Sequence, residues 1–414
     1  MRVPKRIIDR VSRKLEQELA VYRAALAPPH QWLFAPLVLA VLKASSCYVS
    51  EAARELEEEL GGSIGAREER LLHFLHSPKF HSAAVKEAHR KRLRKELKRS
   101  GEVRIYADLS DLSKPYARKM RALDTVRDGS DPDKRKRPGY WLSQVYAVTS
   151  EGALLPVVVE PFSTKEEGFL SQNALILDAM EYVYEATGGR GTWISDRGYD
   201  DRKFFDRLLD RERSFVIRLR LSEKTARILL DAHRRRRRAG TLARKTDLSH
   251  PFSAFRGHKK SRGRFGWQTV YLPDRDEPLT LVVFSNPQDQ PVALLTNRLC
   301  RNASHALCII DDYLGRWHGA EDPLRFLKQQ FRLEKFLVDG MDAIRAWFFL
   351  ILVAFSLLFT LRRGREILRW ILRYAQPFDK EVRFTYYRIF RGFSRLVGAV
   401  PFHFPSACPL PRPP

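Results

Sequence analysis

Alternating strand and helix patterns between residues 103 and 220 constrain this chain more than any other feature. Short runs rich in β-branched and aromatic residues predict strands, and longer runs with apolar residues three or four apart predict helices. The order is strand, strand, strand, helix, strand, helix, strand, over 103–108, 140–149, 153–161, 169–186, 191–196, 201–212 and 214–220. An antiparallel meander followed by crossover units predicts a mixed α/β sheet.

This order is typical of the ribonuclease H-like fold, an α/β architecture in which acidic residues at strand ends carry nucleic-acid chemistry. Asp108 ends the first predicted strand, and Asp196 ends the fourth. A carboxylate at the end of a buried strand needs a partner, and a divalent cation is such a partner. Asp196 has an alternative role as a turn or helix N-cap aspartate. The residues alone leave both roles open.

Helical patterns occupy both ends of the chain. Residues 1–85 are predicted to be mostly helical, with a break at Gly61–Gly62–Ser63 between a Ser-capped helix over 50–60 and a second over 66–75. This pair suits either a helix-turn-helix DNA reader or an ordinary helical hairpin. Helices resume near Ser304, and the Pro-rich tail 409–414 is predicted to be disordered.

One apolar run bears on localisation. Ala346–Leu361 is a run of 16 residues, shorter than the ~20 needed to cross a bilayer, so we favour a buried core helix over a membrane segment. No apolar leader follows the basic N-terminus, which indicates a cytoplasmic protein. Four cysteines without a CxxC pair argue against a disulfide scaffold and a structural zinc site.

The charge balance points to the class of partner. Lys and Arg number 74 against 49 Asp and Glu, a net charge of +25, which indicates nucleic acid or an anionic membrane surface. Lys86–Arg99 holds eight basic and two acidic residues and is predicted to be a phosphate-contacting helix. A second basic stretch, Arg234–Arg264, begins with five consecutive arginines. Strand-like runs at 267–272 and 279–284 make residues 221–300 a predicted β insertion.

Motifs for several common chemistries are absent from the sequence. It has no GxxxxGK[ST] phosphate loop, no HExxH and no GxSxG. A third acidic element remains in the helical region 313–328, where Glu321 and Lys328 are seven residues apart and therefore lie on one helix face. Such a face suits metal and phosphate binding, or alternatively a surface salt-bridge face.

Taken together, these motifs resemble DDE transposases of bacterial insertion sequences, in the cut-and-paste group with the Tyr-Arg-Glu-Lys signature. The resemblance covers about residues 100 to 340. It rests on three motifs in order: Asp108-x-Ser110-Asp111-Leu-x-Lys114; Asp196-Arg197-Gly198-Tyr199; and Tyr313-x2-Arg316-Trp317 leading to Glu321-x6-Lys328.

The resemblance implies a ribonuclease H-like catalytic domain and a DNA-end-binding domain. Predicted domains are 1–99 (helical, end-binding), 100–220 with 301–340 (catalytic), 221–300 (β insertion) and 341–414 (C-terminal helices and tail). Asp108, Asp196 and Glu321 would hold two Mg²⁺ ions, with Mn²⁺ as a substitute. DNA contacts are expected from Arg197, Trp267, Tyr313, Arg316, Trp317, Arg325 and Lys328, with the two tryptophans as candidates for base stacking.

The resemblance also implies a reaction and its partners. The chain would cleave phosphodiester bonds at transposon terminal repeats and join the freed 3′-OH ends to target DNA. It would act as a homodimer or larger assembly on synapsed DNA, in the bacterial cytoplasm near the nucleoid and without a membrane. Two alternatives stay open: a nuclease of the same fold without strand transfer, and a catalytically inactive DNA-binding protein derived from a transposase.

Two departures from the family pattern leave alternatives. The family places three residues between Arg and Glu, whereas four separate Arg316 from Glu321. Either the helix begins one residue later or the copy is defective, with Asp322 as a fallback carboxylate. Asp111 also competes with Asp108, and because they are three apart on a strand their side chains face opposite ways. We favour Asp108, which follows the apolar strand directly.

Overall fold

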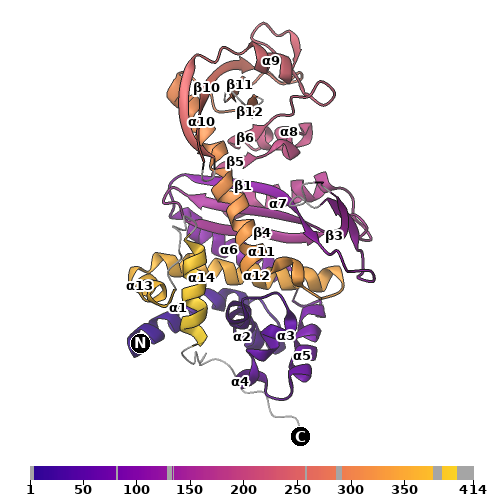
Figure 1. The fold of residues 1–414 in the computed structure, drawn as a ribbon, viewed down its shortest axis with the longest axis vertical. Helices are drawn as coiled ribbons and strands as arrows, with labels where there is room; N and C mark the ends of the chain where they lie inside the picture. The colour runs from indigo at the N-terminus through magenta and orange to yellow at the C-terminus, as the bar shows by residue number, and fades with distance from the viewer. Residues whose placement is uncertain are drawn as a thin grey trace.

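The computed structural model describes residues 4–80, 83–127, 133, 135–256, 259–285, 291–375 and 385–398. Its centre is a ten-stranded mixed sheet, and helices from both ends of the chain pack together below it in Figure 1. The predicted mixed α/β class with flanking helices is confirmed. The predicted disordered tail, 409–414, lies outside the described residues.

The middle of the sheet follows the predicted strand order. An antiparallel meander is formed by β1 (Val103–Ser113), β3 (Lys136–Thr149) and β4 (Leu154–Phe162), with a short unpredicted strand, β2 (Asp124–Arg127), on β3. Two strands then add in parallel beside β1, namely β5 (Thr192–Ser195) and β6 (Phe215–Arg218). Parallel neighbours require crossover connections, which are α7 (Gln172–Thr187) and α8 (Arg202–Asp210).

The length of β1 differs from the prediction. Asp108 does not end this strand, because β1 pairs with β3 as far as Ser113. The parallel pairing with β5 stops at Ala107, opposite Ser195. Asp108 is therefore the first residue of β1 beyond its parallel neighbour, which places it at the carboxyl end of β5 although it lies inside its own strand.

Residues 221–300 form a separate two-stranded sheet and four strands that extend the central sheet. The separate sheet is the hairpin β7 (Ile228–Leu230) and β8 (Arg236–Arg238), which helix α9 (Ala239–Lys245) follows. The four strands are β9 (His250–Arg256), β10 (Lys259–Val270), β11 (Leu279–Ser285) and β12 (Val292–Thr296). Strand β12 pairs antiparallel with β6, Leu295 opposite Ile217. The β-rich segment is thus continuous with the central sheet and makes the upper part of Figure 1.

The helices of the two chain ends pack together on the other side. The N-terminal helices are α1 (Lys5–Arg23), α2 (Pro28–Ala44), α3 (Val49–Arg54), α4 (Glu57–Leu60), α5 (Ile64–His76) and α6 (Ala83–Lys98), and the C-terminal ones are α12 (Met341–Arg363), α13 (Arg365–Tyr374) and α14 (Tyr386–Gly398). The predicted helix over 50–60 is divided into α3 and α4. Ser50 lies inside α3, whereas Ser63 caps α5 by accepting from the Ala66 N–H.

Helix α12 is the core of this helical layer. By length and composition it could cross a membrane, but 89% of its most apolar window is buried inside the protein. It packs on β4 and on α2 and α5, and its Trp347 Nε1 donates to the Cys47 carbonyl at 2.8 Å. This environment supports the core-helix interpretation of the apolar run.

The basic helix α6 also faces inward in part. It packs against α1 and α7, and Arg92 is buried, with Nε donating to Glu18 Oε2 at 2.8 Å. Lys86 pairs with Glu160 at 3.2 Å, and Arg90 pairs with Glu87 and Glu185. A share of the charge that the sequence assigned to phosphate contact is therefore used in holding the helices together.

Candidate functional site

Two rows of side chains cross three neighbouring strands on one face of the sheet. Tyr106, Ile194 and Val216 are aligned on β1, β5 and β6, and they are buried beneath α10 (Ala303–Leu314). Side chains two residues on point to the same face. The next row along these strands is therefore Asp108, Asp196 and Arg218, which explains how two distant aspartates meet.

The third acidic residue arrives on a continuous helix. After α10 the backbone stays helical through Arg316, forms a π-helical turn, η2 (Trp317–Glu321), and continues as α11 (Asp322–Gln330). A π turn holds one residue more than an α turn. The additional residue between Arg316 and Glu321 is thus absorbed, and the expectation that the helix begins one residue later is wrong.

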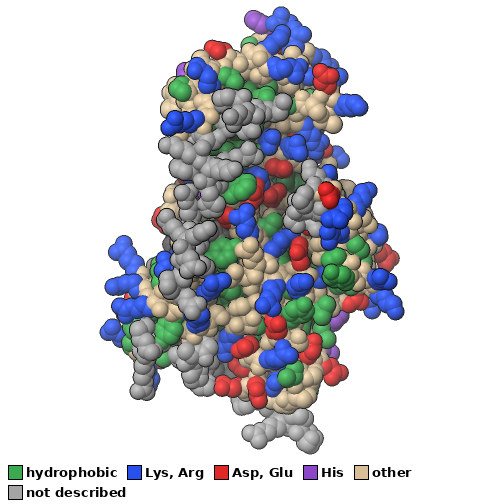
Figure 2. Space-filling model, in the orientation of Figure 1, with side chains coloured by type: hydrophobic (Ala, Val, Ile, Leu, Met, Phe, Trp, Pro, Cys, Tyr) green, Lys and Arg blue, Asp and Glu red, His purple; other side chains and the backbone are tan. Residues whose placement is uncertain are grey.

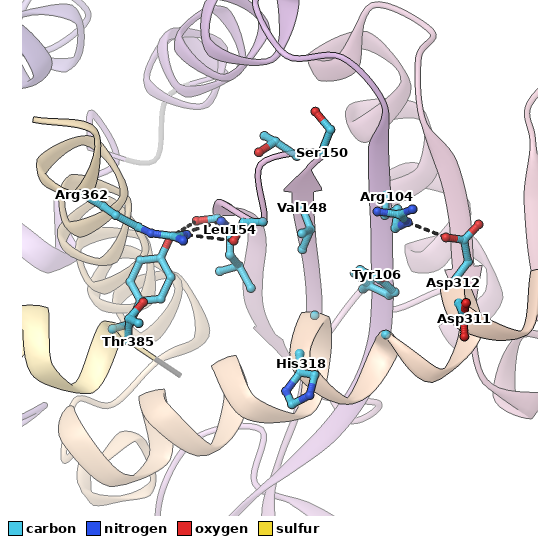
Figure 3. A pocket seen from close by; sticks show the side chains of 15 residues that line it. Arg104, Tyr106, Val148, Ser150, Leu154, Asp311, Asp312, His318, Arg362 and Thr385 are labelled. Carbon is cyan, nitrogen blue, oxygen red and sulfur yellow. Dashed lines mark hydrogen bonds and ion pairs between the residues drawn. The ribbon is translucent and has the colours of Figure 1, made fainter. Parts of the chain in front are cut away.

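The side chain of Tyr106 fixes where this helix lies on β1. A Cβ atom on Gly319 would stand 2.0 Å from the Tyr106 ring, and one on Gly315 would stand 2.6 Å from its hydroxyl oxygen, so the helix backbone contacts the ring directly. Figure 3 shows Tyr106 beside this helix, with Arg104 directed at Asp312. These contacts set the register of the helix along β1.

Arg316 joins two of the three predicted catalytic carboxylates. Its Nη1 donates to Asp108 Oδ2 at 3.0 Å, and its Nη2 donates to Glu321 Oε1 at 2.6 Å. Burial raises the pKa of Asp108 to about 7 and outweighs the lowering by Arg316, with further increases from Asp196 and Glu321. Burial also raises the pKa of Glu321. The site therefore gathers acidic groups around the Arg316 guanidinium.

Asp196 performs the turn role that the sequence offered as its alternative. Its Oδ1 accepts a hydrogen bond from the Gly198 N–H at 2.7 Å, at the start of the short turn η1 (Arg197–Tyr199). The same side chain lies close enough to Asp108 to raise the pKa of that carboxyl. Asp196 can cap this turn and also belong to the acidic row, because the cap uses only its Oδ1 atom.

A divalent cation suits the donor set but not the present spacing. No three His, Cys, Asp or Glu side chains within the described ranges gather closely enough to hold a metal ion. Carboxylate oxygens are the ligands that Mg²⁺ prefers, and Asp108 and Glu321 already share one cationic group. The residues fit a divalent cation chemically, provided that the guanidinium of Arg316 moves aside.

Both competing carboxylates have other partners. Asp322 is buried and accepts from His318 at 2.7 Å and from Arg325 at 3.3 Å. Asp111 lies 3.6 Å from the Nζ atom of Lys328, which also contacts Glu334 at 2.9 Å. Of the alternatives Asp108 and Asp111, it is Asp108 that contacts Arg316. Of Glu321 and Asp322, it is Glu321.

The remaining predicted contact residues are dispersed. Tyr313 is buried with its ring 6.4 Å from that of Phe284, and Trp317 is half-buried in the π turn. Trp267 lies on β10, three strands beyond β6, and stacks on His250 at 5.1 Å. The structure thus does not bring Trp267 to the acidic row.

Some residues of the site were missed from the sequence. Arg218 follows the last parallel pair of β5 and β6, Ser195 opposite Ile217, and so lies next to Asp196 in the acidic row. Gln144 lies opposite Asp108 on β3, and its buried Nε2 has no hydrogen-bond partner among the described residues. Neither residue belongs to a local motif, and only the strand order and register could have identified them.

Comparison with known protein families identifies one family whose model matches this chain. The family model described as the transposase DDE domain matches residues 117–357, a segment that contains Asp196, Arg316 and Glu321. No curated protein matches the chain. A cryo-EM structure of the piggyBac transposase synaptic complex with hairpin DNA is similar at 12% identity and a TM-score of 0.41, covering 96% of this chain and 80% of that one, too weak a likeness to bear on function. Because the family match spans more than half of the sequence, this chain belongs to the transposase DDE domain family.

Proposed function

We propose that this transposase binds the ends of a DNA element, cleaves phosphodiester bonds there and joins the 3′-OH ends to target DNA. One observation carries the proposal: Asp108 and Glu321, from a strand and a helix far apart in sequence, share Arg316 beside Asp196, which follows the end of the neighbouring strand β5. The proposed division of labour follows the predicted domains, with residues 1–99 holding the ends and the sheet carrying the chemistry.

The acidic residues would hold Mg²⁺ or Mn²⁺. A bound divalent ion polarises the phosphate and lowers the pKa of water so that it can attack. Burial around Asp108 and Glu321 strengthens electrostatic interactions at this position. Arg316 would exchange its carboxylate partners for a phosphate oxygen of the DNA, since guanidinium groups bind both anions with similar geometry. The ligands would then become available to the ion.

Substitution of Asp196 tests the proposal. Asp196→Asn should abolish Mg²⁺-dependent cleavage of DNA that carries the element's ends, while binding of that DNA is retained. Asp201→Asn is a matched control, because Asp201 caps the next helix by accepting from the Lys203 N–H at 2.9 Å. Full cleavage by Asp196→Asn would exclude the proposed acidic centre.

A pre-cut DNA end separates the proposed function from its two alternatives. A transposase should join such an end to a target plasmid, whereas a nuclease of the same fold would cut DNA without joining it. A protein that binds DNA but neither nicks nor joins it would be the inactive derivative. The hydrogen bond between Arg316 and Glu321 across the π turn favours an intact site over a defective copy.

A further inference from the structure

A pocket lined by four arginines lies beside the acidic row. Its volume is about 630 Å³. Its arginines come from three places, which are the turn after β5, the end of β6 together with the loop that follows it, and helix α9. They are Arg197, Arg218, Arg220 and Arg244, and no acidic side chain lines the pocket. On the face shown in Figure 2, Lys and Arg side chains gather over the upper part of the molecule, where Figure 1 places α8 and α9.

These arginines differ from two others that acidic side chains hold in place. Arg316 is held by Asp108 and Glu321, and Arg275 is held by Asp206 and Asp210. In contrast, none of the four pocket arginines forms an ion pair with a described acidic residue. Three are exposed and Arg218 is half-buried. The pocket therefore presents uncompensated positive charge in a concave site.

Neighbouring contacts give the pocket a fixed shape. The buried Asp200 carboxylate accepts from the backbone N–H of Arg220 at 2.8 Å and from Arg227 Nε at 2.7 Å. Arg220 Nε in turn donates to the Arg197 carbonyl at 3.1 Å. A Cβ atom on Gly240 would stand 2.5 Å from the Leu221 carbonyl oxygen, so α9 packs directly on this segment. The two loops and the helix are thus held together without using the Arg218 or Arg244 guanidinium.

The position of the pocket relates it to the acidic centre. Asp108, Asp196 and Arg218 each lie one residue beyond the last parallel pairs of β1, β5 and β6, and neighbouring strands lie ~4.8 Å apart. Successive nucleotides of one DNA strand rise by ~3.4 Å in a duplex. A DNA strand that crosses these β-strands with one phosphate at the carboxylates would bring a neighbouring phosphate towards Arg218.

We infer that this pocket binds the phosphodiester backbone of the DNA strand held at the acidic centre, on the β6 side of Asp196. A guanidinium group can donate two parallel hydrogen bonds to two oxygens of one phosphate, and it stays charged at every physiological pH. The inference rests on the proposed function and adds to it a binding site for the DNA that flanks the reacting phosphate. Arg218 and Arg244 carry this role, whereas Arg220 also holds the pocket together.

Salt-dependent binding tests the inference. The full-length Asp196→Asn protein, which should not cut, is titrated with a fluorescein-labelled DNA duplex at several salt concentrations. Removing one phosphate-binding charge should reduce the slope of log K against log salt by ~0.9. Arg244→Gln should reduce it by about 0.9 and Arg218→Gln/Arg244→Gln by about 1.8. Lys245→Gln, the matched control, makes the same charge change one position along α9 outside the pocket and should leave the slope unchanged.

Two outcomes would overturn the inference. One is an equal slope and affinity for Arg244→Gln and Lys245→Gln, with unchanged thermal unfolding of both. The other is calorimetric binding of ATP that the pocket variants lose while their duplex affinity stays that of the parent, which would make the pocket a nucleotide site. Cleavage by the protein with Asp196 intact is assayed separately, so that failure of the proposed function is recorded apart from the binding result.

Discussion

The Nη1 atom of Arg316 lies 3.0 Å from Oδ2 of Asp108, although 208 positions separate the two residues in the sequence. This contact attaches the helix that follows the insertion to the centre of β1. It also supplies the positive charge that a group of buried carboxylates needs. The Arg316 side chain thus stands where the proposed cleavage would require a divalent cation.

Removal of this guanidinium should expose the carboxylates to metal. We expect Arg316→Gln to bind Mn²⁺ about tenfold more tightly than the parent in the absence of DNA, or ~1.4 kcal/mol. The reason is that Mn²⁺ no longer competes with an internal cation for Asp108 and Glu321. Calorimetry or electron paramagnetic resonance of the full chain measures this change.

Arg298→Gln is the control for that experiment, because Arg298 pairs with the buried Asp312 and not with Asp108 or Glu321. Its Mn²⁺ affinity should match that of the parent. Unchanged or weaker Mn²⁺ binding by Arg316→Gln would show that the guanidinium does not compete with the ion.

Sequence patterns were sufficient to predict the order of β1, β3, β4, β5 and β6 and the neighbouring elements that carry Asp108 and Asp196. Asp108 and Asp196 lie together because each follows the last parallel pair of β1 and β5, Ala107 opposite Ser195. The extension of β1 to Ser113 was missed, since it depends on pairing with β3 and not on local composition. The inward role of Arg92 was missed because a charge count does not reveal which face of a helix is covered.

The π turn could not be predicted for a different reason. Residues Trp317–Glu321 have no composition that distinguishes a π turn from an α turn. Its position is set by tertiary packing, with Gly315 and Gly319 against Tyr106. The spacing between Arg316 and Glu321 signalled an irregularity, but its structural solution required the neighbouring strand.

Gly319 should tolerate no side chain. The Cβ atom of Gly319→Ala would meet the Tyr106 ring at 2.0 Å, so the helix must shift away from β1. Overpacking of this kind costs ~1–3 kcal/mol, and we expect that loss in the free energy of unfolding together with reduced DNA cleavage. Chemical denaturation measures the first effect.

Gly65→Ala provides the comparison for Gly319→Ala. Gly65 lies in α5, and a Cβ atom added there would meet nothing within 4 Å beyond its own helix, so alanine should stabilise the helix by up to ~1 kcal/mol. Equal stability of the two variants would contradict the role assigned to the contact between Gly319 and Tyr106.

Deletion of His318 should convert the π turn into an α turn. Four residues of an α-helix advance slightly more than one turn, so Glu321 would still face Arg316 and the buried face of α11 would keep its orientation. We expect thermal stability within ~1 kcal/mol of the parent and retained cleavage, since His318 contributes a partly exposed pair with Asp322.

Deletion of Cys308 is the control for the His318 deletion. Cys308 is an exposed residue within the regular helix α10, where loss of one residue rotates one half of the helix by about 100°. That rotation would turn either Ala306 or the pair Ile309 and Ile310 out of the core. We therefore expect a large loss in the free energy of unfolding. Equal destabilisation by both deletions would indicate that the π turn does not absorb an added residue.

His89 should make stability depend on pH. It is buried in α6, with Nδ1 2.7 Å from the Tyr22 hydroxyl, and burial together with the Arg92 charge lowers its pKa to about 3. The unfolded chain takes up a proton below pH ~6.5 while the folded chain does not, so stability should fall by ~2 kcal/mol between pH 7 and pH 5. His89→Gln removes this titration and leaves the contributions of neighbours such as Glu18. Denaturation at both pH values should therefore show a smaller loss in His89→Gln, and an equal loss in the two proteins would mean that His89 is protonated in the folded state.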